Sequence, residues 1–169
     1  RVLFRSGGVN AVIDSGFKAS EVYRFCRSTG WKPFKGDDAE CFIVKDKAFD
    51  RAVRRIYQKT LVDPAFGTRM QGRVRPLPLY RWSNPSFKDL LFEHMTGLVG
   101  EWVIPRTIGR DYLKQVTAEH RVEETDPRGH ICYRWHQRAK DNHLLDCELM
   151  LMVAAAIAGL VTSKAKQPA

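Results

Sequence analysis

The stretch from Leu149 to Val161 contains no charged residue and consists of Leu, Met, Val, Ile, Ala and a single Gly. Because apolar residues point in every direction around such a helix, the pattern predicts a helix that is buried on all sides. About 13 residues are too few to cross a bilayer, which requires about 20. The stretch therefore predicts a core helix around which the rest of a domain is packed.

Three acids and a histidine lie at the amino end of this helix: Asp141, Asp146, Glu148 and His143. Asp141 or Asn142 can cap the first turn, and acids are favoured there by the helix dipole. Capping alone is therefore one interpretation of the acids. Asp146 differs because it lies one turn inside the helix between apolar neighbours, where a carboxylate needs a partner such as a metal ion. Asp146 is the first candidate for chemistry.

The charge balance indicates a polyanionic partner. The chain has 169 residues, enough for one domain, with 28 Lys and Arg against 19 Asp and Glu, a net charge of +9 and a pI near 9.6. The alternative is a merely soluble basic protein.

Residues 1–6 resemble a translated sequencing adapter and are expected to be a non-native leader. Residues 7–163 are expected to form the domain, incomplete at its amino terminus, and residues 164–169 a polar tail.

The four cysteines, Cys26, Cys41, Cys132 and Cys147, contain no CxxC pair. They are expected to be reduced, buried thiols of a cytosolic protein rather than a disulfide framework or a zinc site. The sequence shows no signal peptide and no membrane-spanning segment.

The first third of the chain predicts strand, helix, strand, the signature of an α/β sheet. The strands are expected at Val9–Ile13 and Trp31–Lys35, and the helix between them at Ser20–Thr29. Asp14 follows the first strand, at the edge where open α/β sheets place their sites. The alternative is that Asp14 only forms the turn of Asp-Ser-Gly.

Basic residues dominate the middle of the chain. Ala48–Tyr57 is expected to be an amphipathic helix with arginines on one side, which is either a phosphate-contacting or a solvated face. The segment Asp63–Pro78 is rich in Gly, Pro and Arg and is expected to be a basic loop. Its Arg69, Arg73 and Arg75 are candidates for contacts with the DNA backbone.

The remaining elements are expected from local patterns. They are short strands at Cys41–Val44, Leu77–Trp82 and Trp102–Ile104, helices after Ser83-Asn84-Pro85 and at Arg110–Ala118, and a hairpin of Arg121–Glu124 with His130–His136.

Known nucleotide-binding and hydrolase motifs are absent: the sequence has no P-loop, no GxSxG and no HExxH. If Asp14 and Asp146 met over the sheet edge, their hard oxygen ligands would suit Mg²⁺ or Mn²⁺, with the carboxylates within roughly 4–8 Å of each other. On a basic protein, such a pair predicts two-metal cleavage of a phosphodiester with water as the nucleophile.

Several motifs occur in an order that resembles one known family. They begin with residues 12–17 (VIDSGF), 21–26 (EVYRFC) and 34–36 (FKG). They continue with residues 87–88 (FK), 104–105 (IP), 112–113 (YL), 116–119 (VTAE), 133–135 (YRW) and 142–147 (NHLLDC). Together they resemble the nuclease domain of lambda-type phage terminase large subunits, from Val9 to Leu160.

The resemblance implies an α/β fold with an RNase H-like mixed sheet flanked by helices, and cleavage of concatemeric viral DNA with Mg²⁺ or Mn²⁺. It implies that Asp14 and Asp146 are the second and third catalytic acids and metal ligands. Lys35 is implied to lie near the site, unless it is an ordinary surface lysine. His143 stands where the family commonly has an acid, so it is only a possible accessory residue.

The resemblance also implies parts that this sequence lacks. The family's first acid lies on an upstream strand, and an ATP-dependent motor precedes the nuclease, so we expect a truncated fragment that lacks its first strands. The sequence leaves open whether this fragment is active alone. The implied partners are double-stranded DNA and, through the full-length protein, the terminase small subunit and the portal. The implied location is the host bacterial cytoplasm, without a membrane.

Two alternatives remain open from the sequence. The first is a non-catalytic basic module that binds DNA or docks other packaging proteins. The second is another RNase H-like nuclease, such as a junction resolvase.

Overall fold

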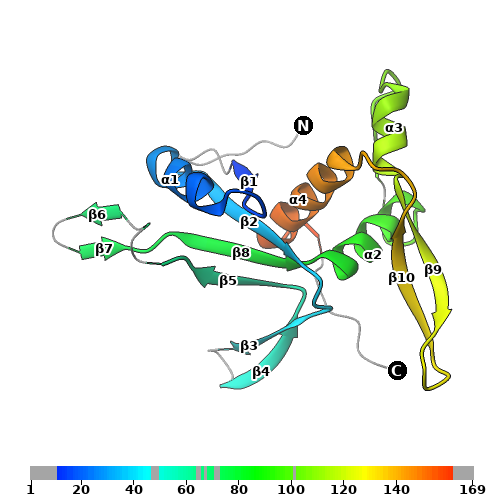
Figure 1. Ribbon diagram of the computed structural model, residues 1–169, viewed down its shortest axis with the longest axis horizontal. Coiled ribbons are helices and arrows are strands. Elements are labelled where there is room, and N and C mark those ends of the chain that lie inside the picture. The colour runs from blue at the N-terminus through cyan, green and yellow to red at the C-terminus, as the bar shows by residue number, and fades with distance from the viewer. Residues whose placement is uncertain are drawn as a thin grey trace. The chain divides into compact units, whose positions relative to one another are not determined.

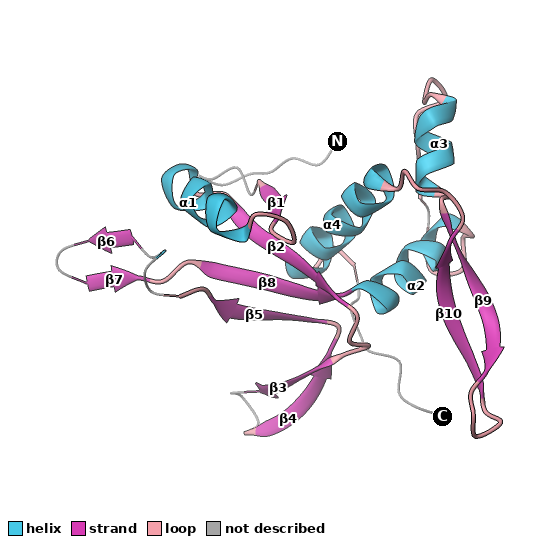
Figure 2. Cartoon of the chain, in the orientation of Figure 1, coloured by secondary structure: helices cyan, strands magenta, loops and turns pink. Residues whose placement is uncertain are grey.

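A computed structural model describes residues 11–46, 50–63, 66, 68–70, 73–100 and 102–161 (Figures 1 and 2). The chain divides into two compact units, which are described separately. The first unit comprises Arg1–Asn84 with Thr162–Ala169, and the second comprises Pro85–Val161.

The first unit is built on a mixed four-stranded sheet in the order β1-β2-β8-β5. The strands β1 (Val12–Asp14), β2 (Lys32–Asp37) and β8 (Pro78–Ser83) run parallel, and β5 (Tyr57–Leu61) is antiparallel to β8. Helix α1 (Ala19–Thr29) connects β1 to β2, as parallel strands require. The predicted α/β class and the strand–helix–strand opening are therefore confirmed, and the mixed sheet is compatible with an RNase H-like domain.

Apolar side chains of α1 and of the strands form the core of the first unit. Cys26 from α1 packs with Val62 and Leu77, and the partly buried residues around them are Ile13, Val22, Tyr23, Phe66 and Leu79. Helix α1 ends where Gly30 adopts φ 79°, a left-handed conformation that glycine adopts without strain. Phe25, on the same helix, is 42% exposed and lies outside this core.

Two antiparallel ribbons extend this unit. One pairs β3 (Phe42–Asp46) with β4 (Arg51–Arg55), and the other pairs β6 (Thr68–Met70) with β7 (Arg73–Arg75). They correct two predictions, because Ala48–Tyr57 contains strand rather than helix and Asp63–Pro78 contains a hairpin rather than only loop. The β-branched Val53 favours a strand, and Asp50, with φ 48°, tolerates the left-handed turn that precedes β4.

The second unit combines three helices with a hairpin. Helices α2 (Asn84–Met95), α3 (Arg110–Val116) and α4 (His143–Ile157) accompany β9 (Glu119–Thr125) and β10 (Ile131–Gln137), which pair antiparallel. The helix after Ser83-Asn84-Pro85, the helix from Arg110 and the hairpin are confirmed. The strand expected at Trp102–Ile104 is wrong, since the structure describes these residues without a strand.

Helix α4 is buried along one stripe rather than on all sides. Leu145, Leu149, Val153 and Ala156 are buried, at the three- and four-residue spacing of one helix face, while Leu151 is 57% exposed. The uniform apolar pattern therefore predicted the helix but overestimated its burial.

Candidate active site

The carboxyl ends of β1, β2 and β8 lie at one edge of the sheet, because these three strands run parallel. Asp14 ends β1, and Asp37 ends β2 in register with Ser83 at the end of β8. Ligand sites of open α/β sheets form at this edge. The structure thus places Asp14 where the sequence predicted a site.

Asp14 is exposed, and the next residue fixes its orientation. Ser15 is buried and donates hydrogen bonds from both its backbone N–H and its hydroxyl to the carbonyl of Phe34, at 2.7 and 2.8 Å. The N–H of Gly16 donates to Asp14 Oδ1 at 3.1 Å. Asp14 therefore forms the expected turn, and the same hydrogen bond holds its carboxylate at the strand end.

The end of β2 presents a second group of polar side chains. Lys35 is exposed, as a surface lysine or a DNA-facing one would be. A Cβ at Gly36 would lie 2.7 Å from Asn84 Oδ1 and 2.8 Å from Asn84 Nδ2, so the Asn84 amide packs against this glycine. Only a residue without a side chain permits that contact.

Asp37 pairs with Arg81, whose guanidinium also lies 5.6 Å from the ring centroid of Phe42. The pKa of Asp37 is lowered by the hydrogen bond from the N–H of Ala39 and by the bond from Arg81. Asp37 was not predicted as part of a site, although Gly36-Asp37-Asp38 after a strand was a signal for one. Because Asp37 pairs with Arg81, we assign it the role of holding the end of β2 against β8.

The first turn of α4 carries the second candidate acid. Asp146 is exposed, and its N–H donates to the carbonyl of Asn142 at 3.1 Å as the helix begins. Asn142 is the N-cap residue, but its side chain makes no capping hydrogen bond. His143 is exposed as well. Asn142 therefore does not cap the helix through its side chain. Asp146 is accessible to solvent and ions.

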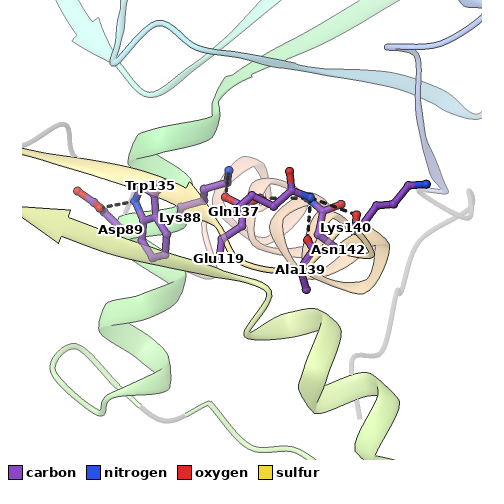
Figure 3. Close-up of polar contacts among 8 residues, drawn as sticks. All are labelled: Lys88, Asp89, Glu119, Trp135, Gln137, Ala139, Lys140 and Asn142. Atoms are coloured by element: carbon purple, nitrogen blue, oxygen red, sulfur yellow. Dashed lines mark hydrogen bonds and ion pairs between the residues drawn. The ribbon is translucent and has the colours of Figure 1, made fainter.

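Asn142 instead joins a buried ion pair. Its Nδ2 donates to Glu119 Oε1 at 3.0 Å, while Lys88 Nζ bonds Glu119 Oε2, with the Lys88 and Glu119 side chains 15% and 7% exposed. Figure 3 shows these side chains together with Gln137, whose Nε2 donates to the carbonyls of Ala139 and Lys140. The network fixes the connection from β10 into α4 and thus the position of the helix start.

Further polar contacts hold the neighbouring elements of the second unit. Trp135 Nε1 donates to Asp89 Oδ1 at 3.0 Å, as Figure 3 also shows. Glu148 accepts hydrogen bonds from the hydroxyl of Tyr112 and from Trp102 Nε1. Burial, followed by the bond to Glu148, raises the pKa of the Tyr112 hydroxyl. Glu148 therefore acts as a structural acceptor in this structure, which the sequence did not reveal.

A mainly apolar cavity of about 230 Å³ lies beside this network in the second unit, lined by residues of α2, β9, β10 and α4 that include Lys88, Phe92 and Trp135.

The residues suited to divalent ions are distributed over both units. Among the described residues, no group of three or more His, Cys, Asp or Glu side chains is arranged to hold a metal ion. Asp14 belongs to the first unit and Asp146 to the second, so their convergence on shared ions stays a prediction. Each is an exposed carboxylate, the donor type that Mg²⁺ and Mn²⁺ prefer.

The three arginines predicted to contact DNA belong to the β6–β7 hairpin. Arg69 and Arg73 belong to β6 and β7, with side chains outside the described set, and Arg75 is exposed.

All four cysteines are free, but only Cys26 is buried and Cys147 is exposed, which corrects the expectation of four buried thiols. Within the described residues, no helix is long and apolar enough to span a membrane.

In a comparison with known families, the chain matches the family model of the terminase large subunit gpA endonuclease domain over residues 8–166. Curated proteins and solved structures gave no match.

Proposed function

The chain belongs to the family of terminase large subunit gpA endonuclease domains, and we propose that it cuts concatemeric double-stranded DNA with Mg²⁺ or Mn²⁺ held by Asp14 and Asp146. The observation that carries the proposal is the family match over residues 8–166, which includes both acids. The position of Asp14 at the carboxyl edge of a mixed sheet supports it.

The two acids are suited to this task by their surroundings. The Gly16 N–H orients the Asp14 carboxylate, and Asp146 lies in the first turn of α4, where the partial positive charge of the helix amino terminus attracts acidic side chains. When bound, two divalent ions stabilise the attacking and leaving oxygens of a phosphodiester. The exposure of both carboxylates leaves them open to a DNA backbone and to the water that we propose as nucleophile.

The proposed partners are DNA and, for the full-length protein, other components of the packaging complex. The basic β6–β7 hairpin, with Arg69, Arg73 and Arg75, is proposed to contact DNA phosphates, because cations there replace counterions condensed on the duplex. The terminase small subunit and the portal are the proposed partners of the full-length protein, acting in the host bacterial cytoplasm. ATP would serve only the motor that precedes the nuclease in this family.

The experiment measures Mn²⁺-dependent nicking of supercoiled plasmid. It uses the chain itself and a version extended by the upstream strand and acid that the family resemblance implies. Asp146→Asn is expected to abolish cutting while DNA binding persists. The matched control is Asp111→Asn, because Asp111 is likewise an exposed acid in the first turn of a helix of the second unit.

Normal cutting by the Asp146→Asn variant would refute the site assignment. Plasmid retention by both versions without Mn²⁺-dependent cutting would favour the non-catalytic DNA-binding module. Cutting confined to four-way junctions would favour a resolvase.

A further inference from the structure

The β3–β4 ribbon is a two-stranded structure outside the four-stranded sheet of the first unit (Figure 1). Its strands pair over their full length, from Phe42 opposite Arg55 to Asp46 opposite Arg51. A two-stranded ribbon buries little of its own surface, so its exposed face is available to a partner.

The base of the ribbon is anchored at the carboxyl edge of the parallel strands. At the β4 end, the N–H of Ser83 donates to the carbonyl of the buried Ile56 at 2.8 Å. At the β3 start, the buried Phe42 ring lies against Arg81, which pairs with Asp37. The ribbon therefore projects from the same edge at which Asp14 lies.

One face of the ribbon is exposed along its whole length. Because side chains alternate between faces and Ile43 pairs with Arg54 while Lys45 pairs with Ala52, these four residues share one face. All four are exposed, with Ile43 65% exposed. The opposite face carries the buried Phe42 and the half-buried Val44 and Val53 at its centre, with the exposed Arg51 and Arg55 at the two ends of β4.

The exposed face carries two cations, Lys45 and Arg54. The segment 42–55 as a whole is also basic, with five lysines and arginines against two aspartates, a net charge of +3. Asp50 pairs with Lys45 at 2.6 Å, but both side chains are more than 70% exposed, so a phosphate can compete for Lys45. Nothing acidic lies on the exposed face itself, whose described members are Ile43, Lys45, Ala52 and Arg54.

We propose that the β3–β4 ribbon docks on duplex DNA through this face, with Lys45 and Arg54 on phosphates and Ile43 and Ala52 toward the groove. Two strands about 4.8 Å apart fit a major groove about 12 Å wide, and small apolar side chains contact thymine methyl groups there. The charge complements a polyanion, and the anchoring at the carboxyl edge directs the duplex toward Asp14. This docking site rests on the proposed function for its choice of DNA as partner.

The test measures the Kd for a fluorescent 30-base-pair duplex by anisotropy, with the full chain in EDTA so that no cutting occurs. Lys45→Gln combined with Arg54→Gln is expected to weaken binding about tenfold and to lower the salt slope by roughly 1.8, since each phosphate contact contributes about 0.9. The matched control is Arg24→Gln combined with Arg27→Gln, two exposed arginines of α1 in the same unit. That control removes the same charge and is expected to change Kd less than twofold.

A second variant separates docking from misfolding. Lys45→Arg combined with Arg54→Lys keeps both charges and is expected to retain the Kd of the unmodified chain. The proposal is overturned if the ribbon and control variants weaken binding equally, or if neutralising the ribbon leaves Kd unchanged.

The binding readout also distinguishes this proposal from the proposed nuclease activity. Ribbon-dependent binding, with no Mn²⁺-dependent cutting by either the chain or its extended version, would support the docking site and refute only the nuclease. Cutting that persists when ribbon neutralisation has no effect on Kd would refute only the docking site.

Discussion

Gly16 lies against the carboxylate of Asp14: a Cβ added there would be 3.3 Å from Oδ2 and 3.4 Å from Oδ1. We predict that Gly16→Ala shifts this carboxylate by a few tenths of an ångström and lowers Mn²⁺-dependent cutting about tenfold, less than the about hundredfold cost of a 1 Å misplacement. Stability should hold, because alanine reduces the entropy of the unfolded chain. Plasmid nicking and thermal unfolding together measure this. Undiminished cutting would show that Asp14 needs no such orientation.

Asp37 links β2 to β8 through Arg81, and its lowered pKa gives the link a pH dependence. A carboxyl whose pKa is depressed on folding stabilises the protein above its unfolded pKa, near 3.8, and this contribution is lost as pH falls below that value. We predict that Asp37→Asn lowers the free energy of unfolding at pH 7 by at most about 1 kcal/mol, since Arg81 is 38% exposed and solvent screens the pair.

The gap between the Asp37→Asn variant and the unmodified chain should then narrow as the pH falls below 3.8. Urea unfolding at pH 7, 4 and 2.5 measures it. Asp38→Asn, an exposed neighbour, is the control for the loss of one charge. A gap of constant size down to pH 2.5 would contradict the prediction.

At the scale of elements, α4 allows a test of one-sided burial. Leu149 is completely buried and Leu151 is 57% exposed, although both belong to the same uncharged stretch. We predict that Leu149→Ala lowers the free energy of unfolding by about 2–5 kcal/mol, because it removes buried methyl groups and leaves a cavity. Leu151→Ala, the same change on the same helix, should cost less than about 1 kcal/mol. Chemical denaturation measures both, and equal losses would restore the all-round burial that the sequence predicted.

Elements with local signals were predictable. The β9–β10 hairpin follows from Asp126-Pro127-Arg128-Gly129, where Asp126 Oδ1 accepts hydrogen bonds from the N–H groups of Arg128 and His130 at 2.8 Å. By contrast, Ala48–Tyr57 was assigned to a helix because arginines at positions 51, 54 and 55 match helical spacing. In the structure this segment contains β4, which pairs with β3, and the first residue of β5, which pairs with β8. The spacing of residues within a segment does not reveal such partners.

At the scale of the whole molecule, the same division applies to the site. Asp14 was predictable because its strand, turn and glycine are contiguous in sequence. The contacts of Asp37 with Arg81, of Lys88 with Glu119 and of Trp102 with Glu148 join residues 44, 31 and 46 positions apart, and no short pattern marks them. The catalytic role of Asp146 was predicted from the family motifs. The hydrophobic pattern alone showed only that an acid lies between apolar neighbours in the helix.

Metal binding by Asp14 and Asp146, as proposed, has a thermodynamic signature apart from catalysis. A ligand that binds only the folded state stabilises it by about 2.7 kcal/mol when present at 100 times its Kd. We predict that Mn²⁺ raises the Tm of the unmodified chain. Either Asp14→Asn or Asp146→Asn should remove most of this increase, because each deletes a ligand of the same ions.

The double variant decides whether the ions are shared. If Asp14 and Asp146 act on one site, combining the two substitutions should remove little more of the Mn²⁺-dependent increase than either alone, since coupled residues are not additive. Additive losses would indicate two separate weak sites, one in each unit. Asp111→Asn should keep the full increase, because that acid shares the helical setting of Asp146 but is not among the proposed ligands. Calorimetry with and without Mn²⁺ thus tests the convergence of the two carboxylates even in a form of the chain that does not cut DNA.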